Sequence, residues 1–254
     1  IKPIDLSGGQ GIQKIDNLNI DKVDEIVKYA FSISKAKKVV IEEFIEGTNH
    51  GLSCILINGK IQFHFCDNEH YYINKYMVSG ASTQSSVPII VINQLIEESE
   101  KIAKILKLKD GIFHIQFIQK DNKAYIIEIC RRPPGDLYID FVKYSTGVDY
   151  PKYLIKAFSG LDISDIEQKE STFITRHCVM TNQNGIIEDV IYDDSIKENI
   201  IDEFIWWKTG DRIEDFMTYK AGIVFLKYNS LVEMEEKTEK INELIKIEVK
   251  NDTI

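Results

Sequence analysis

The sequence predicts an α+β fold, or an α/β fold with a substantial antiparallel sheet. Amphipathic helices are indicated over residues 21–35 and 88–107, where apolar side chains recur at helical spacing. Between them, apolar runs over residues 52–57 and 61–66 flank Asn58-Gly59, which is the strongest short signal for a β-hairpin. Helices interleaved with hairpins are typical of this fold class.

The same patterns predict the remaining elements. Asp21 is the predicted N-cap of the first helix, and Gly160 is predicted to close a helix over residues 149–159. Residues 67–87 show no clear period and are predicted to form a long loop, whereas residues 185–220 are not assigned. Further strands are predicted over residues 38–45, 111–118, 124–129, 172–180 and 221–227, and a final helix over residues 229–242.

Composition excludes several classes of function. The net charge of −9 over 254 residues argues against a nucleic-acid partner, because nucleic-acid phosphates select basic surfaces. No apolar run approaches the roughly 20 residues of a membrane span, and no signal peptide is visible. The four cysteines are far apart and form no CxxC pair, which favours reduced thiols and a cytoplasmic protein.

A glycine cluster lies close to the N-terminus. It comprises Ser7, Gly8, Gly9, Gln10 and Gly11, and Lys2 precedes it on a predicted strand. Backbone N–H groups of such a loop can surround a phosphate, and a lysine supplies a point charge beside it. The loop follows neither the Walker A nor the Rossmann pattern, so a plain tight turn is the alternative interpretation.

Acidic and apolar residues alternate where the predicted strand 38–45 ends. Glu42, Glu43, Phe44 and Ile45 form this segment. Taken alone it fits a solvated strand end. An extended segment of this kind also offers the backbone groups and the apolar wall that an adenine requires.

Glu128 lies within the apolar predicted strand 124–129. A carboxylate in such a strand is costly unless it is paired or binds a metal. Arg131 and Arg132 follow directly, so a structural salt bridge is one interpretation and a metal ligand is the other.

These motifs occur in an order that resembles the ATP-grasp superfamily. The order is a lysine and a glycine loop, a Glu-Glu-Phe-Ile segment, a long amphipathic helix, and a strand pair that ends in Glu128 and Arg132. The likeness is greatest to the branch of carbamoyl-phosphate synthetase, biotin carboxylase and the L-amino-acid ligases. It continues through Thr146-Gly147-Val148-Asp149 to Arg176 in a predicted strand of the tail.

The resemblance implies an ATP-grasp fold, in which two lobes with mixed and antiparallel sheets clasp ATP. It places Lys2 at the α- and β-phosphates and residues 7–11 as a flap over the phosphates. Glu42–Ile45 would hold adenine, and His50 would lie near the ribose or the phosphates. Glu128 and Gln116 would be the ligands of Mg²⁺ (or Mn²⁺), Arg132 would stabilise an acyl-phosphate, and Arg176 would contact the substrate carboxylate.

Two positions depart from the pattern of the family. Gln116 stands where a carboxylate is usual, and Cys130 stands where an asparagine is usual. An amide is a poorer ligand of Mg²⁺ than a carboxylate, and a thiol is poorer still. Asp136 is the candidate that could compensate.

The resemblance implies an ATP-dependent ligase that activates a small carboxylate as an acyl-phosphate for attack by an amine. The alternatives are a biotin carboxylase-like subunit and a non-catalytic ATP-binding module. We expect a small lobe over residues 1–50, a large lobe over 51–170 and a C-terminal extension over 171–254. We also expect an N-terminal domain to be missing, so that this chain has no turnover alone. The substrates are not predicted, and oligomeric state, with a homodimer as one alternative, stays open.

Overall fold

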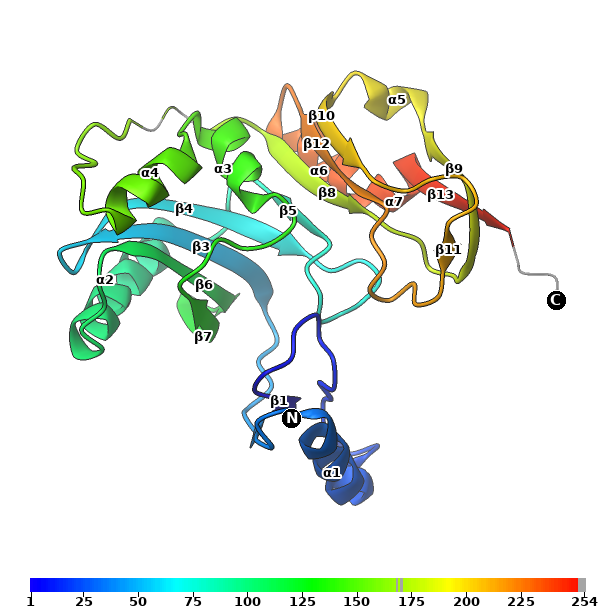
Figure 1. The fold of residues 1–254 in the computed structure, drawn as a ribbon, viewed down its shortest axis with the longest axis horizontal. Helices are drawn as coiled ribbons and strands as arrows, with labels where there is room; N and C mark the ends of the chain where they lie inside the picture. The colour runs from blue at the N-terminus through cyan, green and yellow to red at the C-terminus, as the bar shows by residue number, and fades with distance from the viewer. Residues whose placement is uncertain (168, 170, 251–254) are drawn as a thin grey trace.

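The centre of the protein is an eight-stranded sheet in which every pairing is antiparallel (Figure 1). The computed structural model describes residues 1–167, 169 and 171–250. The sheet has the order β10-β12-β8-β5-β4-β3-β6-β7. Its strands are β3 (Thr48–Ile57), β4 (Lys60–His70), β5 (Gly80–Ser82), β6 (Gly111–Lys120), β7 (Lys123–Cys130), β8 (Ile174–Val179), β10 (Ile200–Ile205) and β12 (Gly222–Lys227).

Helices cover both faces of this sheet. The long helix α2 (Ile89–Ile105) packs on one face, where Val91 and Leu95 join Leu52 and Phe113 in a buried cluster. The helices α3 (Tyr138–Thr146) and α4 (Tyr150–Phe158) pack on the other face, around Phe141. The sheet therefore has two buried faces, and only the ends and edges of its strands are open to a ligand.

The hairpin prediction is confirmed. Asn58 and Gly59 join β3 to β4 with φ values of 50° and 75°, the left-handed conformation that a two-residue turn of this kind requires. The predicted long loop over residues 67–87 is wrong in part, because β4 continues to His70 and β5 pairs with it. Hydrogen bonds between strands stabilise this polar strand end, although it carries no apolar period.

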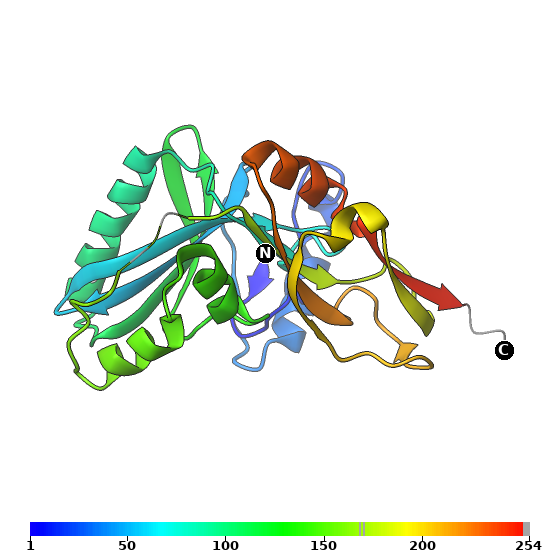
Figure 2. The same cartoon turned by 90° about the horizontal axis from the view of Figure 1, so that it is seen from above.

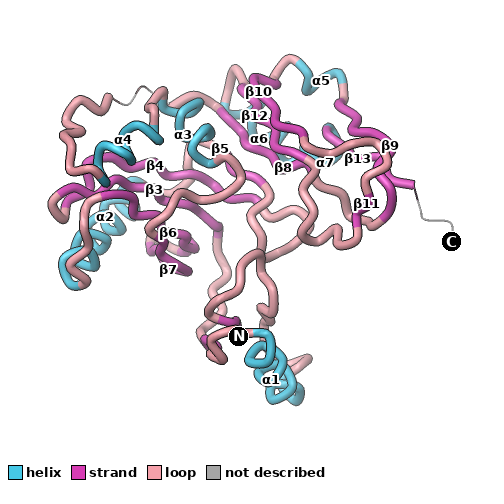
Figure 3. The backbone as a smooth tube through the Cα atoms, in the orientation of Figure 1, coloured by secondary structure: helices cyan, strands magenta, loops and turns pink. Residues whose placement is uncertain are grey.

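The N-terminal part is small and projects from the large sheet. It contains β1 (Lys2–Pro3), which pairs with β2 (Val39–Val40), the 3₁₀ helix η1 (Ile20–Lys22) and α1 (Val23–Ile33). Loop segments join this part to the rest of the protein (Figure 3). It corresponds broadly to the small lobe expected over residues 1–50, although the three predicted domain boundaries stay a prediction.

Two local predictions in this part are wrong. The strand expected over residues 38–45 is limited to β2. Residues 41–45 pair with no strand in the described part of the chain, and Ile41 is exposed. Asp21 lies inside η1 and does not cap α1, whose N-cap is Lys22.

The C-terminal part contains a second sheet that the sequence did not reveal. It is three-stranded and antiparallel, with β11 (Arg212–Ile213), β9 (Gly185–Tyr192) and β13 (Ile245–Lys250) in that order. The short helices of this part are α5 (Asp194–Lys197), α6 (Leu231–Glu239) and α7 (Ile241–Leu244). Seen from above, these yellow-to-red elements lie on one side of the molecule, opposite α2 and the β3–β4 hairpin (Figure 2). No helix in the described part of the chain is long and apolar enough to cross a membrane.

Phe113 provides a test of this packing. Its side chain is fully buried beneath α2, so Phe113→Ala removes a ring and leaves a cavity. We expect the free energy of unfolding, measured by urea denaturation, to fall by about 3–5 kcal/mol. The matched control is Phe44→Ala, because the ring of Phe44 is half exposed and its loss should cost less than about 1 kcal/mol. Equal losses at both positions would contradict this arrangement of the core.

Candidate nucleotide and metal site

Lys2 and Glu42 form an ion pair in the N-terminal part. The pairing of β1 with β2 brings the two side chains together, and the distance from Lys2 Nζ to Glu42 Oε1 is 2.5 Å. Lys2 is largely covered, whereas half of the Glu42 side chain is exposed. The structure thus places Lys2, a predicted phosphate contact, beside Glu42, a predicted adenine contact.

The glycine loop has a steric reason for its composition. Gly8, Gly9 and Gly11 have φ values of 65°, 77° and 74°, a conformation that other residues rarely adopt. A side chain at Gly9 would also lie 2.4 Å from Cβ of Tyr76. The amide of Asn74 donates to the carbonyl of Gly8 at 3.2 Å, so the loop packs against the segment that follows β4. Ser7 and Gln10 belong to the same turn, in which Gln10 N donates to Ser7 O.

The predicted adenine segment is extended but is not part of a sheet. Glu42, Glu43 and Phe44 are exposed, and Ile45 is half-buried. Lys14 lies over the ring of Phe44, with Nζ 4.1 Å from the ring centroid. The backbone N–H and C=O groups of this segment are therefore not paired with another strand.

Gln116 and Glu128 are cross-strand partners in β6 and β7. Because paired residues of an antiparallel sheet share a face, both side chains point to the face that carries α3 and α4. Gly51 of β3 pairs with both Gln116 and Asp67, so one row runs from β4 to β7. A Cβ at Gly51 would lie 2.7 Å from Oδ1 of Asp67, which shows that the missing side chain makes room for this carboxylate.

The environment of Glu128 differs from the prediction. β7 is an edge strand, so Glu128 is exposed and not buried among apolar neighbours. The arginines do not pair with it: Arg131 donates to the carbonyls of Lys109 and Asp110, and Arg132 donates to the carbonyl of Pro133. Within the described residues, Glu128 forms no ion pair, and the salt-bridge interpretation is wrong.

Glu69 lies beside Gln116 and was not predicted. Its Oε1 accepts a hydrogen bond from Nε2 of Gln116 at 2.7 Å, and its Oε2 accepts one from the hydroxyl of Tyr71 at 2.7 Å. Burial raises the pKa of the Glu69 carboxyl, against the lowering effect of these two hydrogen bonds. Burial likewise raises the pKa of Asp67, to which the hydroxyl of Tyr138 donates at 2.7 Å.

His50 lies on the opposite face of the sheet. It pairs with Phe117, which neighbours Gln116, so its ring points away from the Gln116–Glu128 pair. Its Nδ1 bonds to the carbonyl of Asp67 and its Nε2 to the hydroxyl of Thr48. Burial lowers the pKa of His50. The structure therefore separates His50 from the predicted metal ligands.

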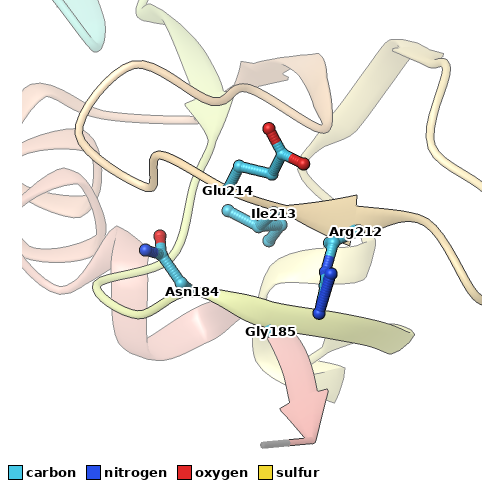
Figure 4. Close-up of a pocket in the computed structure, with 5 residues that line it drawn as sticks. All are labelled: Asn184, Gly185, Arg212, Ile213 and Glu214. Atoms are coloured by element: carbon cyan, nitrogen blue, oxygen red, sulfur yellow. The ribbon is translucent and has the colours of Figure 1, made fainter. Parts of the chain in front are cut away.

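A cavity of about 620 Å³ lies where β3 begins and β4 ends, next to α6. His50, Glu69 and Tyr71 are among the residues that line it, and no lysine or arginine does. A second hollow of about 340 Å³ lies on the three-stranded sheet (Figure 4). None of the predicted site residues lines this second hollow, whose lining is Asn184, Gly185, Arg212, Ile213 and Glu214.

Arg176 is buried in β8 and contacts Asp136. Its Nη1 donates to the carbonyl of Asp136 at 3.1 Å and lies 3.6 Å from Oδ2 of the same residue. Nζ of Lys220 lies 2.5 Å from this oxygen. Since two cations share its carboxylate, Asp136 would have to give up these contacts to bind a metal, and its role as a compensating ligand stays a prediction.

The candidate ligands suit one metal ion that is held by two side chains of the protein. Among the described residues, no group of three or more His, Cys, Asp or Glu side chains is arranged to hold a metal ion. Gln116 and Glu128 nevertheless offer an amide and a carboxylate oxygen from one face of adjacent strands, and oxygen is what Mg²⁺ prefers. Cys130 is two residues further along β7, and its thiol donates to the carbonyl of Arg132 at 3.5 Å.

Sequence reasoning missed Asp67, Glu69 and Tyr138. Asp67 and Glu69 are two residues apart, which is the spacing of a strand, but residues 67–87 lack the apolar period that predicts one. Tyr138 begins α3, a helix that was not predicted. A strand prediction that tolerated polar residues would have found the two carboxylates.

Comparison with known proteins identifies the family. The sequence model of the ATP-grasp domain matches residues 1–136, and the chain belongs to this family. The resemblance inferred from the motifs is thereby confirmed, as is the α+β fold class. The matched region contains every predicted site residue except Arg176.

Curated relatives agree with this family, and solved structures agree with the fold. The carbamoyl phosphate synthase large chain of Caldanaerobacter subterraneus subsp. tengcongensis is 26% identical over 180 residues, which cover 66% of this chain and 16% of that protein. The L-amino acid ligase from Bacillus licheniformis superimposes with a TM-score of 0.76 at 16% identity, over 94% of this chain and 62% of that one. The biotin carboxylase from Campylobacter jejuni gives 0.72 at 14% identity, over 98% and 58%.

The contact of Asp136 with two cations predicts a cost for its neutralisation. Asp136→Asn keeps a side chain that tolerates the φ of 56° at this position, so that only the charge is lost. It leaves Arg176 buried and without its counter-charge. We expect the free energy of unfolding to fall by about 2–3 kcal/mol, a discounted value because Asp136 is partly exposed.

The matched control is Asp165→Asn, which breaks the surface ion pair with Lys156. Its loss should be clearly smaller in the same urea titration, because exposed ion pairs contribute little. A variant of Asp136 that is as stable as the parent would show that Arg176 does not depend on this carboxylate.

Proposed function

We propose that this chain is the ATP- and Mg²⁺-binding part of a ligase, which activates a carboxylate as an acyl-phosphate for attack by an amine. Membership of the ATP-grasp family supports this proposal, as does the similarity to carbamoyl phosphate synthase large chains. The structural observation that carries the proposal is the environment of Glu128. Asp67, Glu69 and Asp136 all have partners in the described structure, whereas Glu128 is exposed at the sheet edge without a cation.

The nucleotide would lie between the N-terminal part and the sheet. Lys2 would contact the phosphates, and residues 7–11 would offer backbone N–H groups from above. The extended segment Glu42–Ile45 would present its unpaired backbone groups to the base. Such a site holds phosphate by local amides and a few cations, which is compatible with the net negative charge of the protein.

Glu128 and the amide oxygen of Gln116 would hold the metal ion. When bound, Mg²⁺ offsets the negative charge that develops as a phosphoryl group moves. The residues of the chain orient the reactants. Arg132, which is exposed two residues beyond the end of β7, would stabilise the acyl-phosphate electrostatically.

Arg176 would attract the carboxylate of the substrate. Its Nε is buried and has no hydrogen-bond partner among the described residues, and an unpaired buried donor is costly. Lys220 adds a second positive charge at the same place. These two residues lie outside the region matched by the family model, so the C-terminal part would contribute to substrate binding.

Calorimetric titration with Mg·ATP tests the proposal. We expect the chain to bind Mg·ATP and Glu128→Ala to weaken this binding by at least about tenfold, because a carboxylate ligand of the metal is lost. The control is Glu97→Ala, which removes an exposed carboxylate on α2, a helix to which no nucleotide contact is assigned. Binding of Mg·ATP that is unchanged in Glu128→Ala would refute the metal assignment, and absence of binding by the parent chain would refute the proposal as a whole.

A further inference from the structure

Gln116 has an amide whose orientation is determined by its neighbour. An amide side chain can present either its nitrogen or its oxygen to a given contact, and a metal ion accepts only the oxygen. Nε2 of Gln116 donates to Oε1 of Glu69 at 2.7 Å. Because a carboxylate oxygen cannot donate, this contact directs the nitrogen to Glu69, and the oxygen is left for another partner.

Glu69 is itself held in place. Its other oxygen, Oε2, accepts a hydrogen bond from the hydroxyl of Tyr71 at 2.7 Å. With both of its oxygens accepting hydrogen bonds, Glu69 can be faced only by the donor end of the Gln116 amide, which is its nitrogen. Glu69 belongs to β4 and Gln116 to β6, and both side chains lie on the face to which Glu128 also points.

We infer that Glu69 is a positioning residue, which holds the Gln116 amide with its oxygen directed to the metal site at Glu128. This inference rests on the proposed function. A carboxyl group thus lies one contact behind the proposed ligand, on Glu69. A carboxylate behind an oxygen ligand orients that ligand and makes it a better donor to the metal.

The inference predicts that Glu69→Gln has opposite effects in two backgrounds. In the natural chain it allows the Gln116 amide to turn over, because two facing amides can pair in either orientation. We expect the affinity for Mn²⁺·ADP to fall about tenfold. In a chain that carries Gln116→Glu, the parent Glu69 faces a second carboxylate, which cannot donate the hydrogen bond that the amide donates. There Glu69→Gln supplies an amide donor, and we expect the affinity to rise about tenfold.

The experiment measures Mn²⁺·ADP binding by calorimetry and by the electron paramagnetic resonance of bound Mn²⁺, so it does not require turnover. It compares the parent chain with Glu69→Gln, Gln116→Glu, the double variant and Glu128→Ala. The charge-matched control is Glu235→Gln. It removes an exposed carboxylate of α6 that lines the same cavity as Glu69. Its affinity should stay within about twofold of the parent, since exposed charges are screened.

The sign of the effect decides between two explanations. If Glu69 acted only through its negative charge, Glu69→Gln would weaken binding in both backgrounds, and that result would overturn the inference. Thermal denaturation of each variant shows whether the fold is retained. If the parent chain binds no Mn²⁺·ADP, the proposed function fails. If the parent binds, Glu128→Ala does not, and the sign does not reverse, the inference about Glu69 fails alone.

Discussion

The hydrogen-bond register of β4, β3, β6 and β7 determines which polar side chains can act together. Asp67, Gly51, Gln116 and Glu128 occupy one row across these strands, so their side chains share a face. A shift of one residue in any pairing would move a carboxylate to the face covered by α2. The pairing of these four strands therefore has to form before the candidate metal site exists.

This polar face has a cost that neighbouring elements offset. Asp67 is buried and Glu69 is partly buried, and each obtains hydrogen bonds from tyrosine or glutamine side chains. Arg176 acts electrostatically on both of them from β8. Since β8 lies beyond residue 136, the C-terminal part completes the electrostatic environment of a site whose other members lie in the family-matched region. The eight-stranded sheet unites the two regions physically, because β5 pairs with β8.

Sequence patterns predicted the elements that have apolar periodicity or strong turn chemistry. The α2 helix and the turn at Asn58-Gly59 are of this kind, because local sequence alone specifies them. Polar strand ends and edge strands are different. The end of β4 and the exposure of Glu128 depend on which strands lie alongside, and periodicity contains no information about neighbours. The motifs indicated the family and one acid of the candidate metal site, but they could not show that Glu69 contacts Gln116.

The ion pair between Lys2 and Glu42 defines what a nucleotide would have to replace. Both residues are proposed contacts of the same ligand, yet here they neutralise each other. An ion pair with one exposed partner contributes only about 0–1 kcal/mol, so exchanging it for contacts with phosphate and base costs little. Binding of a phosphate group contributes more free energy than this, because the phosphate accepts charge-assisted hydrogen bonds from both the lysine and the backbone of the glycine loop. The pair can therefore keep Lys2 positioned on β1 without preventing it from turning to a phosphate.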